Sequence, residues 1–314
     1  MTGGALRAHA ALQQAGLGGA GSLTRVSNTT NEVWMAGQYV LRINRSGNVR
    51  GTLRHELRAL ETLASVVPVP EPVSYGEATF GEWIVLRRVP GQELSRTWPA
   101  MSDRQRREAI TALGRALKRL HSVDPFAAGL DAPPIPVEPA IDVLARVARL
   151  PHVETGLIRD AAELLTSTMG ALDQRPTALI HGDLHFENVL WDGERLTAII
   201  DWEWARAAAA DEELDVLMHS LANPALHVST DYAASVSRQD YECVTGWLRA
   251  AYPELFAHPR LAERLTTYRL AYDARALLRD PPDRPADQLP RHHPYRRLQR
   301  LVEGRSDLLW TLNA

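Results

Sequence analysis

The 314-residue chain contains a single cysteine, Cys243, and no run of 18 apolar residues. One cysteine cannot form an internal disulfide, so a reducing compartment is the simplest environment for the protein. Without a long apolar run there is no candidate transmembrane helix, and the first residues lack the apolar segment of a signal peptide. We therefore expect a soluble, cytoplasmic protein with no membrane partner.

Positive charge is not in excess either. The formal net charge is -3, which argues against nucleic acid as the main partner. Lys118 is the only lysine among 35 basic residues, and codon bias is the simpler explanation for this shortage. The length and the 45% content of hydrophobic residues allow a substantial core and favour two lobes or domains.

Alternating apolar and polar residues in the first 89 positions predict a small antiparallel sheet. We expect its strands near 23–26, 32–36, 38–43, 73–75 and 82–88. Leucines at three- to four-residue spacing predict a helix at 49–64, and a shorter helix is expected at 5–15. Pro90-Gly91 interrupts this pattern, so we expect an N-terminal lobe at residues 1–89 and a second lobe at 90–314.

The second lobe is expected to be mostly helical. Ser102 and Gln105 have the spacing of a capping box, which predicts the start of a long helix that ends near His121. We expect His121 to make a structural hydrogen bond. Further helices are predicted at 139–150, 156–173, 215–222, 238–252, 260–279 and 292–303.

The N-terminal region offers candidates for contact with a phosphate group. The short polar side chains from Ser27 to Asn31 form either a plain hairpin loop or a loop whose N–H groups and hydroxyls cover an anion. Arg42 lies on an apolar strand and Glu56 in the following helix. Such an ion pair is often solvated and then contributes ~0–1 kcal/mol; alternatively, it holds a cation against nucleotide phosphates.

One stretch, residues 179–202, combines strand-like sequence with chemically active side chains. Its two apolar runs flank Asp192-Gly193, a dipeptide that favours a tight hairpin turn. Asp183 and Asn188 precede the hairpin, and Asp201 ends its return strand. This combination is typical of a functional site, because an acid and an amide lie at the open end of the hairpin and a second acid lies at the end of its return strand.

Two kinds of chemistry are compatible with this stretch. His181, Asp183 and His185 alternate, so in an extended segment they would share one side and could bind zinc as in a metal hydrolase. That interpretation leaves Asn188 and Asp201 unexplained. Phosphoryl transfer needs a carboxylate for the acceptor hydroxyl, oxygen ligands for Mg²⁺ and positive charge on the donor phosphates. These needs are met in turn by Asp183, by Asn188 with Asp201, and by Arg42.

The segment His181-Gly182-Asp183-Leu184-His185-x-x-Asn188 closely resembles the catalytic loop of the aminoglycoside phosphotransferase family of small-molecule kinases. It is also similar to the H-R-D-L-x-x-x-N loop of protein kinases. Residues 199–203 look like that family's metal-binding segment, and Asp211-x-x-x-Asp215 resembles its next acidic stretch, with Ala210 and Glu212 in place of glycine and proline. The resemblance runs from about residue 20 to 220. It implies an α+β, bilobal protein-kinase-like fold, with a small antiparallel N-terminal sheet and a mostly helical C-terminal lobe.

The resemblance also implies roles for individual residues. Asp183 would be the catalytic base, and Asn188 and Asp201 would bind Mg²⁺. ATP or GTP, the phosphate donor, would lie between the lobes, and its purine ring would lie near the backbone of residues 87–89. His181 and His185 would brace the loop. The nucleotide site would comprise Ser27, Asn31, Arg42, Glu56, Arg87 and Val89.

Position 42 departs from protein kinases and from some members of the family, which have lysine there. The only lysine, Lys118, belongs to a predicted helix and cannot substitute. A permanently charged guanidinium, which other members carry, can grip phosphates bidentately. We therefore expect an active kinase, with a non-catalytic nucleotide-binding protein as the alternative.

The acceptor is expected to be a small hydroxyl-bearing molecule, and the fold does not fix its identity. Glu203 and Asp211 are candidate acceptor residues, because their acidic surroundings would attract a cationic antibiotic such as an aminoglycoside. The same acids could instead form a solvated helix start. Trp202, Trp204 and Tyr272 could wall a hydrophobic acceptor or pack in the core. A metabolite such as an amino sugar, choline or homoserine is the alternative acceptor, and the oligomeric state stays open.

Overall fold

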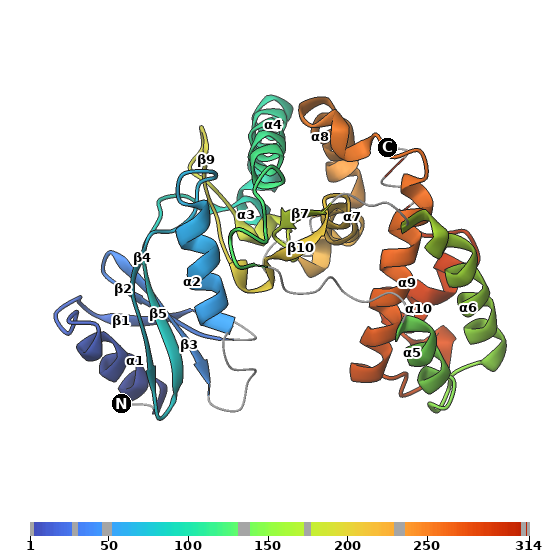
Figure 1. Ribbon diagram of the computed structural model, residues 1–314, viewed down its shortest axis with the longest axis horizontal. Coiled ribbons are helices and arrows are strands. Elements are labelled where there is room, and N and C mark those ends of the chain that lie inside the picture. Colours follow the sequence, from blue (N-terminus) through green and yellow to red (C-terminus); the bar gives the residue numbers. More distant parts are fainter. Residues whose placement is uncertain are drawn as a thin grey trace.

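The computed structural model describes residues 3–26, 31–45, 52–130, 139–172, 177–228, 236–308 and 312. In this part of the chain an antiparallel sheet with two helices lies at one end of the molecule, and a mostly helical part forms the rest (Figure 1). The predicted α+β class and the order of its parts are confirmed. None of the described helices is long and apolar enough to span a bilayer.

Five strands form the N-terminal sheet, in the order β1-β2-β3-β5-β4 with antiparallel neighbours. Alternation along the central strand sends Leu41 and Ile43 to one face, where both are buried against helix α1. Arg42 therefore faces the other side, where helix α2 carries Glu56. The elements of this lobe are α1 (Gly3–Gln14), β1 (Leu23–Val26), β2 (Glu32–Ala36), β3 (Tyr39–Arg45), α2 (Thr52–Leu63), β4 (Pro72–Ala78) and β5 (Gly81–Arg87).

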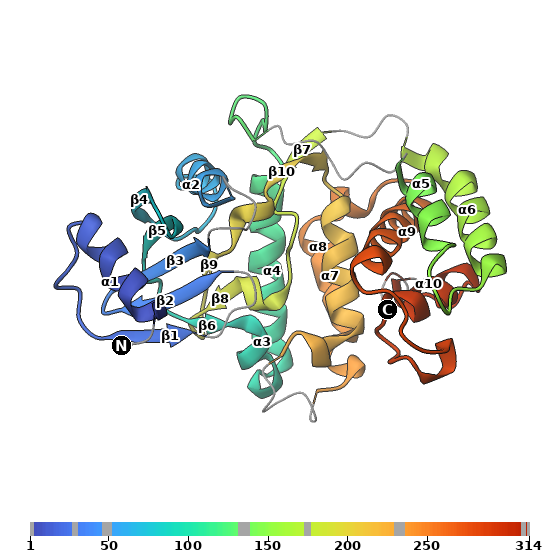
Figure 2. The ribbon, with the colours of Figure 1, turned by 90° about the horizontal axis from the view of Figure 1, so that it is seen from below.

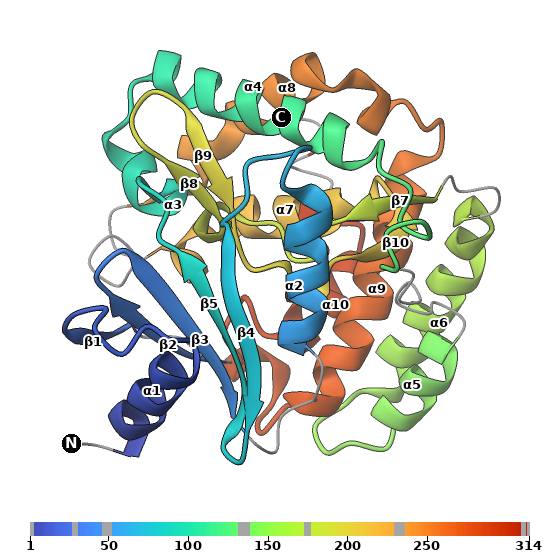
Figure 3. The ribbon, with the colours of Figure 1, turned by 60° about the vertical axis from the view of Figure 1, so that its left-hand side comes forward.

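Residues 88–91 connect β5 to the rest of the molecule. The next strand, β6 (Gln92–Glu93), pairs with β8 (Val189–Trp191), which pairs with β9 (Leu196–Ile199). Helix α2 lies between the N-terminal sheet and this part (Figures 1 and 3), and its leucines share one core cluster with Leu113, Leu117 and Ile199. The division into lobes at residue 89 stays a prediction, although the chain passes from the five-stranded sheet to the sheet of β6, β8 and β9 in this segment.

The predicted β8–β9 hairpin is present, and its turn is centred one residue later than expected. Four residues, 192–195, connect the strands, and the Asp192 carboxylate accepts hydrogen bonds from the N–H groups of Glu194 and Arg195. Only Gly193 of the predicted dipeptide has positive φ, at 107°. The Asp192 N–H also donates to the Arg195 carbonyl at 3.2 Å, so the predicted tight turn is present, with Gly193 and Glu194 rather than Asp192 and Gly193 at its centre.

Helices make up most of the remainder, and their predicted positions agree with the structure to within a few residues. The Ser102 capping box is present, with both hydrogen bonds to and from Gln105. The elements are α3 (Leu94–Thr97), α4 (Asp103–Leu120), α5 (Pro139–Val147), α6 (Thr155–Met169), β7 (Thr177–Ile180), β10 (Arg206–Ala209), α7 (Glu212–Ala222), α8 (Glu242–Ala251), α9 (Leu261–Arg279) and α10 (Pro294–Val302).

Four of these helices, α5, α6, α9 and α10, form a bundle at the end of the molecule opposite the N-terminal sheet (Figure 2). They enclose a second hydrophobic cluster that includes Leu165, Leu270 and Leu298. Short 3₁₀ segments complete the described elements at Trp98–Ala100, Gly170–Leu172, Phe186–Asn188, Trp202–Trp204, Pro224–Leu226, Arg238–Tyr241, Pro253–Phe256 and Ala286–Gln288.

Candidate active site

The loop between β7 and β8 carries Asp183, and its backbone requires a glycine at one position. Gly182 has φ of 83°, a conformation that side-chain-bearing residues rarely adopt. A Cβ atom at this position would also overlap with the Arg206 guanidinium and the Trp204 carbonyl. The Gly-Asp pair is therefore dictated by the fold of the loop as well as by the chemistry of the acid.

The buried carboxylate of Glu213 holds this loop through hydrogen bonds to its backbone. The N–H groups of His181 and Gly182 donate to the two oxygens of Glu213 at 2.7 and 3.1 Å. Burial acts to raise the pKa of Glu213, but the nearby His121 and His181, together with the hydrogen bond from the His181 N–H, outweigh it and lower that pKa. His121 lies 3.8 Å from Glu213 and 3.3 Å from the Tyr252 hydroxyl, so it has the predicted structural role.

His181 also braces the loop. Its Nδ1 accepts a hydrogen bond from the Asp183 N–H at 3.2 Å, and its Nε2 lies 2.9 Å from the Ile200 carbonyl, to which it donates. The ring is fully buried and packs on Trp202 at 4.5 Å between centroids. With both nitrogens occupied, His181 cannot join Asp183 and His185 in a zinc site, so that alternative interpretation is wrong.

Asp183 itself is accessible, with 41% of its side chain exposed. His185 Nε2 lies 3.8 Å from its Oδ2. Partial burial acts to raise the pKa of Asp183, but the nearby His185, His181 and His227 outweigh this and lower that pKa. A carboxylate that is ionised and open to solvent can accept a hydrogen bond from a hydroxyl group, as a general base must.

Asn188 and Asp201 come together at the open end of the hairpin. The Ile200 N–H donates to the Asn188 carbonyl at 2.9 Å, and the Asn188 side-chain amide donates to the Asp183 carbonyl at 2.9 Å. Asp201 has left-handed backbone angles, φ 68° and ψ 59°, which are unfavourable for an aspartate and typical of functional positions. An amide oxygen and a carboxylate are hard ligands, so the donor chemistry here fits Mg²⁺.

Arg42 connects the N-terminal sheet to this hairpin. Its guanidinium donates to Glu56 at 2.5 Å and to Asp201 at 2.6 Å, and it lies 3.4 Å from Glu203. Asn31 donates to the same Glu203 carboxylate at 2.9 Å. The structure thus brings together four of the predicted nucleotide and metal residues, which are Asn31, Arg42, Glu56 and Asp201.

Three carboxylates surround this one guanidinium, and the pKa values reflect their crowding. Burial disfavours the charged form of Arg42, but Glu56, Asp201 and Glu203 outweigh it and raise the pKa of the guanidinium. Burial raises the pKa of Glu56 to about 7 despite Arg42. Burial, together with Asp201, also raises the pKa of Glu203. The acids exceed the cation in charge, so the cluster is suited to attract a further positive ion.

The family described as "Phosphotransferase enzyme family" matches residues 20–252, about three quarters of the sequence. The chain belongs to the phosphotransferase enzyme family.

Two curated phosphotransferases are similar to this family member. Streptomycin 3''-kinase of Streptomyces griseus is 33% identical over 165 residues, which cover 48% of this chain and 58% of that protein. Viomycin phosphotransferase of Streptomyces vinaceus is 30% identical over 157 residues, which cover 47% and 54%. The chain therefore aligns with little more than half the length of each of these relatives.

Solved structures share the fold at lower identity. The GDP complex of aminoglycoside 2'-phosphotransferase-IIIa matches with a TM-score of 0.70 and 19% identity, covering 98% of this chain and 99% of that one. A choline/ethanolamine kinase family protein from Mesorhizobium loti matches with a TM-score of 0.64 and 22% identity, covering 99% and 100%. At these identities the likeness establishes the fold alone.

The other predicted nucleotide residues lie apart from the Arg42 cluster. The N–H of Arg87 donates to the Glu71 carbonyl at 2.8 Å, and its exposed side chain pairs with Glu71. This N–H is therefore not free for a nucleotide base, whereas the Val89 N–H makes no backbone hydrogen bond within the described ranges. Ser27 lies outside the described residues.

The predicted acceptor acids have other partners in this phosphotransferase. Asp211 is buried, and both of its oxygens bind the buried Arg264 guanidinium. Glu203 faces Arg42 and Asn31. The acids that open α7 are thus neither a solvated helix start nor an exposed acidic patch, and we leave Asp211 out of the proposed acceptor site. Of the aromatic candidates, Trp202 is fully buried, while Trp204 and Tyr272 are exposed.

The sequence did not indicate two further residues of the site. Glu213 was one acid in a run, and only the fold shows that it holds the loop. His227 lies 3.5 Å from Glu187, and its ring centroid is 5.2 Å from that of His185. Glu187 and His227 are forty positions apart, so no local spacing could have indicated their contact.

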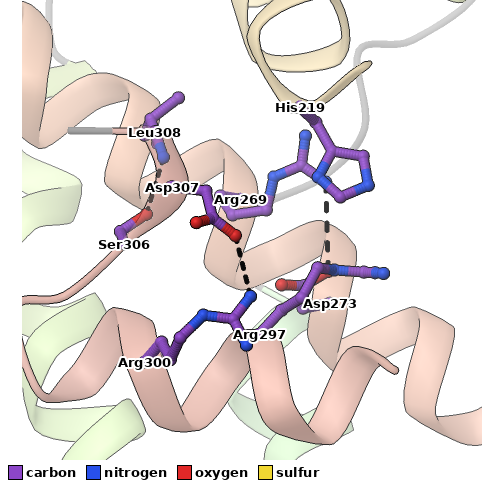
Figure 4. A pocket seen from close by; sticks show the side chains of 8 residues that line it. All are labelled: His219, Arg269, Asp273, Arg297, Arg300, Ser306, Asp307 and Leu308. Atoms are coloured by element: carbon purple, nitrogen blue, oxygen red, sulfur yellow. Dashed lines mark hydrogen bonds and ion pairs between the residues drawn. The ribbon is translucent and has the colours of Figure 1, made fainter. Parts of the chain in front are cut away.

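A pocket lies beyond His227, between α7, α9, α10 and the segment after α10 (Figure 4). It is lined by His219, Arg269, Asp273, Arg297, Arg300, Ser306, Asp307 and Leu308. Its arginines pair with its aspartates, Arg297 with Asp273 and Arg300 with Asp307. The ring centroids of His219 and His227 are 6.4 Å apart. The His227 ring therefore lies between the pocket residue His219 and His185 of the Asp183 loop.

Proposed function

We propose that this protein transfers the γ-phosphate of ATP or GTP to a hydroxyl group of a small molecule. The observation that carries the proposal is the contact of Arg42 with Asp201 at 2.6 Å. This contact joins a cation of the N-terminal sheet to the hairpin that follows Asn188. The loop that ends at Asn188 also carries the exposed carboxylate of Asp183. Phosphoryl transfer depends on this combination of positioning and charge.

Each residue then has one task. Asp183 accepts the proton of the acceptor hydroxyl, and Glu213 and His181 hold the loop that positions it. Arg42, oriented by Glu56, exchanges part of its contact with Asp201 for the donor phosphates. Asn188 and Asp201 would hold Mg²⁺, which when bound would neutralise charge on the phosphates. The N–H of Val89, which makes no backbone hydrogen bond within the described residues, would receive the nucleotide base.

The acceptor is proposed to be an antibiotic of the kinds named for the curated relatives, streptomycin or viomycin. The support is the sequence similarity alone, because the acids expected to attract a cationic acceptor are used inside the protein. A metabolite such as an amino sugar, choline or homoserine is the other acceptor class within the same reaction.

A panel assay tests the reaction and the acceptor together. The purified protein is incubated with Mg²⁺, with ATP or GTP, and with each acceptor in turn; nucleoside diphosphate release is measured, and the product is weighed by mass spectrometry. We expect one acceptor class to gain a single phosphate group, and the Asp183→Asn variant to form no product above background. Product formation by that variant at the wild-type rate would contradict the role of Asp183.

One observation favours a second candidate, a nucleotide-binding protein without catalysis. Arg42 is bonded directly to Asp201, the residue proposed for Mg²⁺. If this pair persists with nucleotide, Mg²⁺ should not strengthen nucleotide binding. Calorimetric titration of ATP with and without Mg²⁺ decides between the two, since the kinase requires tighter binding with Mg²⁺.

A further inference from the structure

Three metal-ligating side chains meet beside Asp183, and none of them has a task in the proposed reaction. His185 and Glu187 lie in the loop before β8, and His227 follows α7. His185 Nδ1 and His227 Nδ1 each lie 3.5 Å from the same Glu187 oxygen, Oε2. The exposed fractions of the three side chains are 14%, 39% and 25% in sequence order, so an ion from solvent can reach them.

The separations fit a tetrahedral transition-metal site. Two nitrogen or oxygen ligands at about 2.0–2.2 Å from zinc, at a tetrahedral angle, are roughly 3.3–3.6 Å apart. Both distances to Glu187 lie in this range. All three ligand atoms lie within 4.8 Å of one another, so a small rotation of the half-buried His227 ring completes the set. The fourth position would be left for water.

The surroundings of His185 favour a metal over an ordinary hydrogen bond. Its Nδ1 atom is buried and makes no hydrogen bond to any described residue. Its other nitrogen, Nε2, lies 3.3 Å from the Asn188 amide and 3.8 Å from the Asp183 carboxylate. A histidine that binds a metal through one ring nitrogen commonly donates the other N–H to a carboxylate, and the carboxylate near Nε2 is that of Asp183, 3.8 Å away.

We propose that His185, Glu187 and His227 bind one divalent transition-metal ion, zinc by preference, and that the ion inhibits phosphate transfer. Two imidazoles and one carboxylate suit zinc and not Mg²⁺, which takes oxygen ligands. The bound ion fixes His185 with its Nε2–H directed at Asp183, so an oxygen needed by the acceptor hydroxyl is occupied. The inhibition rests on the proposed kinase function, whereas the metal site does not.

Metal binding is measured first, without nucleotide. A Cys243→Ser background removes the exposed thiol, which could bind zinc outside the cluster. Competition with a chromophoric chelator gives the zinc affinity and stoichiometry, and Co²⁺ in place of zinc reports a tetrahedral site by its visible absorption. We expect one ion per chain, with His227→Ala and Glu187→Gln each weakening binding by more than about tenfold.

The matched control is His292→Ala, which removes an exposed imidazole far from the cluster in the sequence and should bind zinc like the parent. Equal melting temperatures show that the variants are folded. Absence of bound zinc in the parent, or parent-like binding by His227→Ala, overturns the site.

Activity is measured second, at saturating Mg²⁺ and nucleotide. The parent should lose turnover as zinc fills the site, and His227→Ala should require more zinc by the same factor as its loss of affinity. Equal inhibition of both proteins would mean that zinc acts at Asn188 and Asp201, which overturns the inhibitory role. If no acceptor is phosphorylated at all, the proposed function fails while the binding measurement still decides the site.

Discussion

Two groups of acids in this protein differ in how their charges are matched. Around Arg42, the carboxylates of Glu56, Asp201 and Glu203 share one guanidinium. At the start of α7 three acids each have an arginine partner, whereas Glu213 is held by the N–H groups of His181 and Gly182. The pairs there are Asp211 with Arg264, Glu212 with Arg206, and Asp215 with Arg269.

The difference separates acids that serve a site from acids that serve the fold. A buried pair with matched charge is complete, and removing one partner leaves an unpaired charge inside the protein. A group of three acids around one cation keeps excess negative charge, which is unfavourable unless another cation binds. We therefore expect the unmatched acids to matter for ligand binding and catalysis, and the matched acids for stability.

The largest effect is expected from Asp183→Asn, since Asp183 has no arginine partner among the described residues. Loss of a general base should lower kcat by ~10²–10⁴. Because Asp183 is partly exposed, the free energy of unfolding should stay near the wild-type value. Steady-state kinetics and urea unfolding, with nucleotide affinity by calorimetry, check this. A stable variant with near-normal kcat would remove Asp183 from the mechanism.

Asp211→Ala should do the reverse. It leaves the Arg264 guanidinium buried without its partner, which should lower the free energy of unfolding by about 3–5 kcal/mol. The double variant Asp211→Ala/Arg264→Met is the control, because an apolar side chain in place of the charge should recover part of the loss. Urea unfolding measures both. Wild-type stability combined with a lost affinity for the acceptor would restore Asp211 to the acceptor site.

The two groups of acids also differ in how well they could be predicted from the sequence. Helices and strands were predictable because apolar periodicity is local, and the loop of Asp183 was identified by its resemblance to a known family. The partners of the acids were not predictable. Arg264 lies 53 positions after Asp211, and only the packing of α9 against α7 brings the two together. From the sequence alone, the acidic run at Asp211 therefore predicts solvent-exposed acids, whereas the structure shows that these acids are buried.

Glu56→Gln should change the pH dependence of stability. Burial raises the pKa of Glu56 to about 7, above the ordinary value of a glutamate. The folded state therefore holds a proton that the unfolded state has released, and its stability falls as pH rises from about 4.5 to about 7. The glutamine variant lacks this titration, so its decrease over the same range should be smaller, by on the order of 1 kcal/mol.

Unfolding of the ligand-free protein in urea at about pH 5 and about pH 7.5 measures this difference. The control is Glu61→Gln, an exposed glutamate of the same helix, which should keep the wild-type slope. A slope for Glu56→Gln as steep as the wild type would show that Arg42 keeps Glu56 ionised in the folded state across this range.

The smallest effect on stability is expected from Glu203→Gln, and Glu212→Gln is its matched counterpart. Each side chain is 7% exposed and contacts a buried arginine. The glutamine at 203 can still accept the Asn31 hydrogen bond and relieves repulsion with Asp201, so stability should change by less than about 0.5 kcal/mol. The change at 212 weakens the 2.7 Å pair with Arg206 and should cost about 1.5–3 kcal/mol. Equal losses in urea unfolding would mean that charge matching does not distinguish the two groups.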